Sequence, residues 1–97
     1  MNAIWKFEMV LEDEPTIEMP VGARPLSVGV QKVSDGDMLV LWAHIPDTTQ
    51  PMERRHFFIL GTGNPIQWQV EESTFIGTVQ MESFVWHVFD QRKTERV

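Results

Sequence analysis

The sequence contains no cysteine in its 97 residues, which excludes disulfide bonds and thiolate zinc sites. A chain without cysteine fits a reduced compartment, and we expect a cytoplasmic location. The first residues lack a basic stretch followed by an apolar run, so we expect no signal peptide. No apolar segment reaches the roughly 18 residues of a membrane helix, so we expect no membrane partner.

An excess of positive charge is also missing. The formal net charge is −6 at pH 7, whereas proteins that bind duplex nucleic acid usually carry a strong cationic excess. We therefore expect no duplex nucleic acid as a partner. The acidic balance leaves small anionic ligands open, because a pocket for such a ligand needs only one or two arginines.

Helical periodicity is absent as well, and several segments instead alternate between apolar and polar residues. Residues 3–11 alternate between apolar and polar side chains, which is typical of a half-buried strand. Residues 38–45 are apolar on both faces and are expected to form a central strand, preceded by a hairpin turn at Asp35-Gly36. Residues 16–19 fit a short edge strand. Further on, residues 74–81 and 84–90 are expected to form a hairpin around Glu82-Ser83.

Turn signals recur every eight to twelve residues or so, a spacing that favours antiparallel sheets. With 42% hydrophobic residues, the chain has enough apolar material for one core. The sequence therefore predicts one β-rich domain over residues 1–97: an all-β, small antiparallel β-sandwich or barrel of about six to seven strands, with at most one short helix near Glu71. Residues 91–97 are polar and mostly charged, so we expect a flexible tail.

The segment from Arg54 to Ile66, RRHFFILGTGNPI, brings cations, aromatics and glycines close together. It fits neither the phosphate-binding loop nor the dinucleotide-binding loop, because the third glycine, the lysine and the helix pattern are missing. Two interpretations remain. The glycines can form a structural turn after a strand, or their backbone N–H groups can face an anion that Arg54 or Arg55 covers.

Residue patterns for catalysis or metal binding are lacking. His44, His56 and His87 each lie inside an apolar strand, without the spacing of a metal site. The serines have no nucleophile-elbow context, and the acids lie in polar segments where burial would not raise a pKa. We expect no enzyme, no metal and no cofactor.

The tryptophans differ in position. Trp42 and Trp86 lie within strands and are expected in the core, whereas Trp5 and Trp68 lie nearer element ends, where an indole can line a pocket or an interface. So many aromatic rings are hard to bury in so small a domain. We therefore expect a homo-oligomer in which some of them lie between subunits.

Five short motifs, spread over nearly the whole chain, resemble a family of bacteriophage and prophage proteins of similar length. They are Ile4-Trp5-Lys6-Phe7, Thr16-Ile17-Glu18-Met19-Pro20, Leu41-Trp42-Ala43, Gly61-Thr62-Gly63 with Pro65-Ile66, and Phe84-x-x-His87-Val88-Phe89. The resemblance implies a phage accessory protein in the cytoplasm of a host bacterial cell, and it implies no reaction. In that family a histidine is usual at the position of Asn64. Asparagine keeps a hydrogen-bonding side chain and tolerates left-handed backbone, so a turn or ligand-contact role survives.

These observations favour a non-enzymatic protein that binds and sequesters a small anionic ligand, with a nucleotide signal of host immunity as the leading hypothesis. Arginines would pair with phosphates, turn N–H groups would cap them, and a ring would stack on the base. The expected ligand-binding residues are Arg54, Arg55, Gly61, Thr62, Gly63, Asn64, Trp5 and Trp68.

The alternative is a protein-interaction module that inhibits or recruits a host or phage protein through a strand edge or an aromatic patch. One distance separates the two hypotheses. Arg55 lies about 17 Å from the glycine turn along an extended strand, so a second subunit or a folded-back strand would have to bring both to one ligand.

Overall fold

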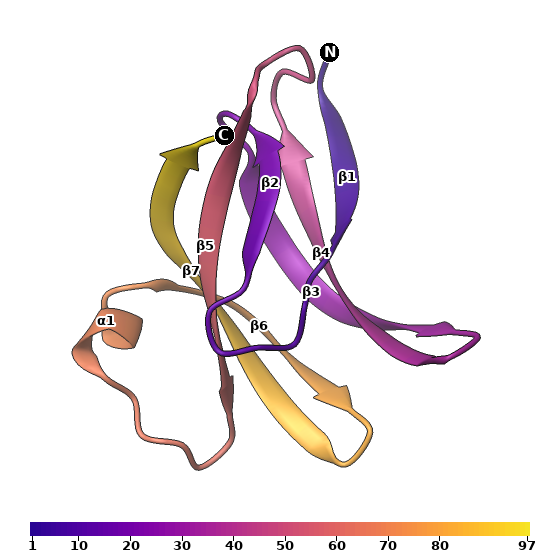
Figure 1. The fold of residues 1–97 in the computed structure, drawn as a ribbon, viewed down its shortest axis with the longest axis vertical. Helices are drawn as coiled ribbons and strands as arrows, with labels where there is room; N and C mark the ends of the chain where they lie inside the picture. The colour runs from indigo at the N-terminus through magenta and orange to yellow at the C-terminus, as the bar shows by residue number, and fades with distance from the viewer.

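Seven antiparallel strands form two facing sheets in a computed structural model that describes residues 1–97 (Figure 1). The strands of one sheet lie in the order β1-β4-β3, and those of the other in the order β2-β5-β7-β6. The elements are β1 (Ala3–Glu8), β2 (Thr16–Pro20), β3 (Arg24–Val33), β4 (Gly36–Ile45), β5 (Met52–Gly61), α1 (Trp68–Glu71), β6 (Thr74–Met81) and β7 (Phe84–Arg96). The predicted all-β sandwich with one short helix is thereby confirmed. That helix is too short to cross a membrane.

The strand predicted over residues 38–45 is central. β4 lies between β1 and β3, so its apolar residues are covered on both edges by neighbouring strands. β3 and β4 form a hairpin at the predicted Asp35-Gly36 turn, and β6 and β7 form the predicted hairpin around Glu82-Ser83. β2 is an edge strand, as expected for residues 16–19.

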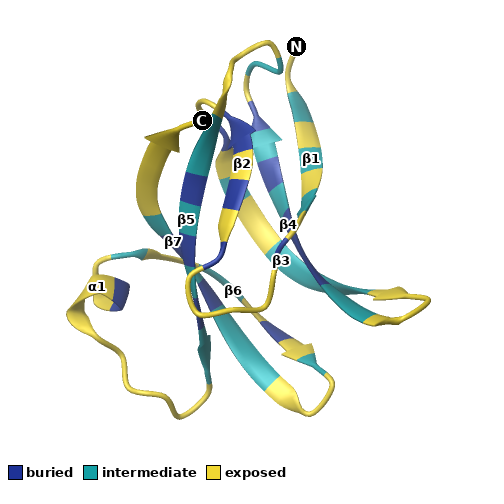
Figure 2. Ribbon diagram, viewed as in Figure 1, coloured by how far each residue is buried: buried dark blue, intermediate teal, exposed yellow.

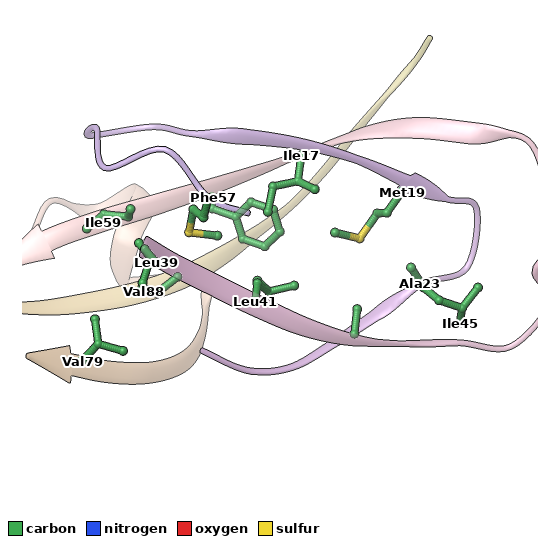
Figure 3. Packing of buried hydrophobic residues seen from close by; sticks show 12 residues of the cluster. Ile17, Met19, Ala23, Leu39, Leu41, Ile45, Phe57, Ile59, Val79 and Val88 are labelled. Carbon is green, nitrogen blue, oxygen red and sulfur yellow. The ribbon is translucent and has the colours of Figure 1, made fainter. Parts of the chain in front are cut away.

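The core lies between the two sheets. Buried residues gather where β4 faces β5 and β7, while the outer surfaces and the hairpin tips are exposed (Figure 2). Leu41 of β4 and Phe57 of β5 meet in the middle of this core, and both are fully buried (Figure 3). Ile17 and Met19 of β2 extend the core, because the alternation of this strand points them inward. Each sheet therefore contributes one apolar face.

The prediction of a flexible tail at residues 91–97 is wrong. β7 continues to Arg96, and its last residues pair with the beginning of β5, with Glu53 opposite Arg96 and Arg54 opposite Glu95. This half of β7 has only one neighbouring strand, since the β6 pairing ends at Asp90. An edge segment that is exposed on both faces needs no apolar residues, which explains its polar composition.

The pairing of β6 with β7 shifts at Ile76, so Phe75 lies exposed against Phe89 while Gly77 lies opposite Val88. One further expectation needs correction. Trp42 is not part of the core. It lies on the outer face of its sheet, half-buried, with its ring over Gly29. Trp86 does pack against the core.

Candidate functional site

The structure does not bring the predicted ligand-binding residues together within one chain. Arg54 and Arg55 lie near the start of β5, whereas Gly61 ends the same strand. Trp5 belongs to β1 in the other sheet, where it packs against the core. Trp68 begins α1. The predicted site is therefore divided over several places, each of which has its own environment.

The contacts of Arg55 are those of a residue that stabilises the fold. It is buried, and its Nη1 donates to the backbone carbonyl of Ala23 at 2.7 Å. Its Nη2 lies 3.3 Å from Oδ2 of Asp90, and Nη1 lies 3.6 Å from Oε1 of Glu53. A guanidinium held by two carboxylates and a carbonyl is already neutralised, so it is not free to receive a phosphate.

Arg54 also lies among acids. Its cross-strand neighbours in the sheet are Glu18 of β2 and Glu95 of β7. Opposite charges on directly opposed strand positions attract each other, so this arginine stabilises the sheet. Neither arginine of β5 points to a ligand site at the glycine turn.

The glycine turn itself is tied to the protein. The N–H of Thr62 donates to Val85 C=O at 3.2 Å, and the N–H of Asn64 donates to Gly61 C=O at 3.2 Å. Gly63 adopts a φ of 92°, which a residue with a side chain rarely does. With these N–H groups occupied, the turn offers little to an anion, and the geometry supports the structural interpretation.

Trp68 lies beside a different set of cations. A hollow of about 410 Å³ lies between α1 and β7, within the size range of small-molecule sites. We call it the Trp68 hollow. Its lining combines an indole, two cations, two carboxylates and three amide side chains: Glu14, Phe58, Gln67, Trp68, Gln69, Val70, Glu72, Gln91, Arg92 and Lys93.

The short helix positions Trp68. Val70 is the only buried residue of α1, and it fixes the helix against the outer face of the second sheet. Trp68 precedes Val70 by two residues, about 200° around a helix, and therefore points away from the protein. Its side chain is 65% exposed, which is unusual for the largest apolar residue type.

A bulge in β7 positions the two cations. Arg55 pairs with Thr94 and Phe57 pairs with Asp90, so residues 91–93 of β7 stand opposite the single residue 56 of β5. Arg92 has a φ of 59°, in the left-handed region that a non-glycine residue seldom occupies. Extra residues in a strand turn side chains out of the sheet, and here they place Arg92 and Lys93 at the hollow.

Hydrogen bonds hold this bulge in place. Oδ1 of Asp90 accepts the N–H of Arg92 at 2.8 Å, and Nε2 of Gln91 donates to Phe57 C=O at 2.9 Å. The guanidinium of Arg92 donates through Nη2 to the carbonyl of Glu72, next to α1. The bulge thus connects β7 with the helix, and both sides of the hollow are fixed relative to each other.

A second hollow, of about 240 Å³, adjoins the first. It shares Glu14, Phe58, Gln67 and Val70 with the Trp68 hollow and extends to Asn64 and Pro65. Of the predicted ligand-binding residues, Trp68 and Asn64 therefore lie along one continuous depression. A further hollow on the other side of the glycine turn is lined by Gly61, Thr62, Gly63, Asn64 and His87, and it contains no cation.

The sequence prediction missed Arg92 and Lys93 because it placed them in a flexible tail. One signal was available. The charges of residues 53–54, Glu-Arg, are complementary to those of residues 95–96, Glu-Arg, when the two segments run antiparallel. Opposite charges at opposed positions favour strand pairing. This complementarity indicates that the end of the chain returns to β5.

The three histidines lie in separate hydrogen-bond networks. His44 lies between Arg24 and Asn2, and His56 contacts Glu95. His87 lies between Thr62 and Thr78, at 2.8 and 2.9 Å from their hydroxyls. Across residues 1–97, no group of three or more histidine, aspartate or glutamate side chains is placed to hold a metal ion.

Comparison with protein families gives one match. The profile described as "Domain of unknown function (DUF7352)" covers residues 1–97. The chain belongs to this family. No curated protein and no solved structure matches the chain. Membership in DUF7352 states no activity, and the Trp68 hollow is the candidate site of this chain.

Proposed function

We propose that this DUF7352 protein binds a small nucleotide in the Trp68 hollow and catalyses no reaction on it. One observation carries the proposal: an exposed indole lies in the same hollow as two cations, which a left-handed bulge holds at that place. Planar bases stack on indole rings, and guanidinium groups pair with phosphate oxygens in a two-pronged geometry. A nucleotide presents both features in one molecule.

The charge of the lining narrows the class of ligand. Arg92 and Lys93 are balanced by Glu14 and Glu72, so the hollow has no net charge at neutral pH. A ligand that consists only of anionic groups gains little binding free energy in the hollow, because the carboxylates repel it as the cations attract it. A nucleotide pairs its phosphate with the cations and donates its ribose hydroxyls to a carboxylate. The side-chain amides of Gln67 and Gln69 add donors and acceptors for the edge of a base, and Gln91, whose Nε2 donates to Phe57 C=O and Glu14, adds its carbonyl oxygen as an acceptor.

Binding without catalysis is supported by the residues that line the hollow. They include no serine, threonine, cysteine or histidine that would act as a nucleophile or a proton carrier. A phage accessory protein in a bacterial cytoplasm, the setting that the sequence resemblance implies, would use such a site to sequester a nucleotide signal of host immunity. Cyclic and linear nucleotides are therefore the first ligands to test.

Isothermal titration against a panel of cyclic and linear nucleotides tests this function. The expected result is heat of binding with at least one of them at a protein concentration of about 50 μM, together with quenching of the exposed Trp68 fluorescence. Trp68→Ala should abolish the quenching and weaken binding. Arg96→Ala is a matched control, since Arg96 is an exposed cation of β7 outside the hollow. Absence of heat with every nucleotide contradicts the proposal, as does binding that Trp68→Ala leaves unchanged.

A second candidate is a module that binds another protein through an aromatic patch. The observation in its favour is the exposure of Phe84, at 62%, at the start of β7, where its ring lies 5.9 Å from that of Trp86. A pull-down from bacterial lysate should then recover one stoichiometric partner, and the Phe84→Ser variant should lose it. Recovery that does not depend on Phe84 argues against this candidate.

A further inference from the structure

β1 presents an unpaired backbone edge. It is the outer strand of its sheet, with β4 on one side and no strand on the other (Figure 1). The N–H of Met9 donates to Leu39 C=O at 2.9 Å, which continues the ladder between β1 and β4. Every second residue of an antiparallel strand bonds the same neighbour. The backbone groups of Ile4, Lys6 and Glu8 therefore point to the free edge, and Val10, two residues past the end of β1, continues the same alternation of exposed and buried residues.

The side chains of Ile4, Lys6 and Glu8 share the outer face of the sheet, and Val10 is exposed just beyond the end of the strand. Ile4 is 64% exposed and Val10 is 66% exposed, while Lys6 and Glu8 lie exposed between them. Along the strand the order is apolar, cation, anion, apolar. Such an order is complementary to its own reverse, because a cation then meets an anion and an apolar residue meets an apolar residue.

We propose that β1 pairs with β1 of a second copy of this chain, antiparallel and about a two-fold axis at Phe7. Lys6 of each copy then lies opposite Glu8 of the other, and Ile4 lies opposite Val10. The pairing joins two three-stranded sheets into one continuous sheet and removes both free edges. It concerns a surface apart from the Trp68 hollow and does not depend on the proposed nucleotide binding.

Neighbouring registers are less favourable. A shift that places the axis at Lys6 brings the two Lys6 side chains opposite each other, and an axis at Glu8 does the same for the two carboxylates. An axis at Trp5 sets Ile4 against Lys6 and forms no ion pair between the two β1 strands. A shift of the second copy by one residue is excluded. The free N–H and C=O groups of one β1 would then lie opposite residues whose own N–H and C=O groups already bond β4. Among registers that pair residues within β1, only the one centred on Phe7 sets a cation opposite an anion.

The interior side of β1 fits the same axis. Phe7 is half-buried, and in this register it meets Phe7 of the second copy, while Trp5 meets Met9. The pairing therefore covers what remains exposed of Trp5 and Phe7. Within a single chain, Nζ of Lys6 donates to Oε1 of Gln31 at 2.8 Å. An exposed hydrogen bond to a neutral amide is readily exchanged for a carboxylate.

Analytical ultracentrifugation of charge variants tests the pairing. The wild-type chain should sediment as a dimer whose fraction rises with concentration, and Lys6→Glu or Glu8→Lys alone should weaken the dimer at least about tenfold. The double variant Lys6→Glu/Glu8→Lys restores opposite charges and should recover the dimer. Lys32→Glu/Asp37→Lys reverses the ion pair between β3 and β4, away from β1, and serves as the control. A wild-type monomer at every concentration overturns the proposal, and so do single variants that dimerise normally.

Cysteine cross-linking tests the register independently. The chain has no cysteine of its own, so Ile4→Cys/Val10→Cys introduces the only thiols. These positions are six residues apart, about 20 Å along one strand, which is too far for a bond within one copy. Oxidation should therefore give a covalent dimer with this double variant and none with Ile4→Cys alone. A dimer trapped by Lys6→Cys alone, and not by the double variant, would refute the axis at Phe7.

Discussion

Arg55 and Asp90 form an ion pair in the interior, with 3.3 Å between Nη2 and Oδ2, and their side chains are only 10% and 9% exposed. Asp90 also accepts the backbone N–H of Arg92, so one carboxylate holds both a buried cation and the β7 bulge. Arg55 in turn reaches the carbonyl of Ala23, in the connection between β2 and β3. Both residues belong to the sheet β2-β5-β7-β6, and the bond to Ala23 links this buried pair to the connection that leads into the other sheet.

Removal of one partner of this pair should destabilise the fold strongly. Asp90→Ala leaves Arg55 with the more distant Glu53 as its remaining carboxylate, and we expect a loss of about 3–5 kcal/mol in the free energy of unfolding. The Lys32–Asp37 pair is a matched control, because the lysine is exposed and Lys32→Ala should cost less than about 1 kcal/mol. Urea denaturation measures both. Similar losses for the two variants would contradict the structural role of the buried pair.

Truncation separates a paired β7 from a flexible tail. Deletion of residues 93–97 removes the pairing of β7 with Glu53, Arg54 and Arg55. At roughly 1 kcal/mol per backbone hydrogen bond, we expect a loss of about 2–4 kcal/mol, with faster hydrogen exchange at the start of β5. Unchanged stability and unchanged hydrogen exchange would indicate that these residues form a flexible tail and do not stabilise the sheet.

The hydrophobic pattern was a sufficient guide to the strands that carry a strong apolar signal. β1 and β4 could be predicted because each has an apolar set with period two or a continuous apolar run. The bulges could not be predicted, since the shifts at Leu26, at Ile76 and at residues 91–93 arise from pairing with a distant strand. The register of a strand pair depends on both strands, so the sequence of one strand alone does not determine it.

The candidate site was predicted only in part, for the same reason. The sequence grouped Trp68 with Arg54 and Arg55 because an indole near the end of an element can line a pocket, but the arginines lie at the start of β5 and Trp68 begins α1. Arg92 and Lys93 are far from Trp68 in number, and the β7 bulge brings them to it. The candidate hollow contains the residue types of the expected site, an indole and two cations, but its cations are Arg92 and Lys93 in place of Arg54 and Arg55.

The packing of Trp42 over Gly29 makes this glycine sensitive to substitution. A Cβ at position 29 would lie 2.8 Å from Cζ3 of Trp42, closer than carbon atoms approach each other. Gly29→Ala should therefore cost about 1–3 kcal/mol in the free energy of unfolding and change the near-ultraviolet circular dichroism of the indole. In Trp42→Phe, which retracts the ring, Gly29→Ala should cost much less. Equal costs in both backgrounds would show that the ring is not the cause.

Asp47 makes the free energy of unfolding depend on pH under acidic conditions. The Thr49 hydroxyl, at 2.6 Å, lowers the Asp47 pKa from 3.8 to about 2, assisted by the Thr49 backbone N–H and the Gln50 amide. Because the folded-state pKa is depressed, the stabilisation is complete above pH 4 and is lost as the pH falls towards 2. An NMR titration of the Asp47 carboxyl carbon should show the low midpoint. Thr49→Ala should raise it, and Thr48→Ala, at a neighbour without this bond, should not.

The final prediction concerns the left-handed backbone of Arg92. Arg92→Gly relieves a conformation that costs a residue with a side chain about 1–2 kcal/mol, but it removes the bond to Glu72 C=O, worth about 0.5–1.5 kcal/mol. The two effects nearly cancel, so its stability should stay within about 1 kcal/mol of the wild type. Arg92→Ala loses the bond and keeps the strain, and it should be less stable than Arg92→Gly by about 1 kcal/mol. Urea denaturation distinguishes them.

Nucleotide binding should follow a different order. Both variants remove the same guanidinium from the Trp68 hollow, so both should weaken binding by about ten- to a hundredfold, measured by titration calorimetry. Stability then separates the two variants, and affinity does not. If affinity instead followed stability, the effect of Arg92 on binding would be that of the fold alone. If neither variant bound less tightly than the wild type, the cation of the proposed site would not be Arg92.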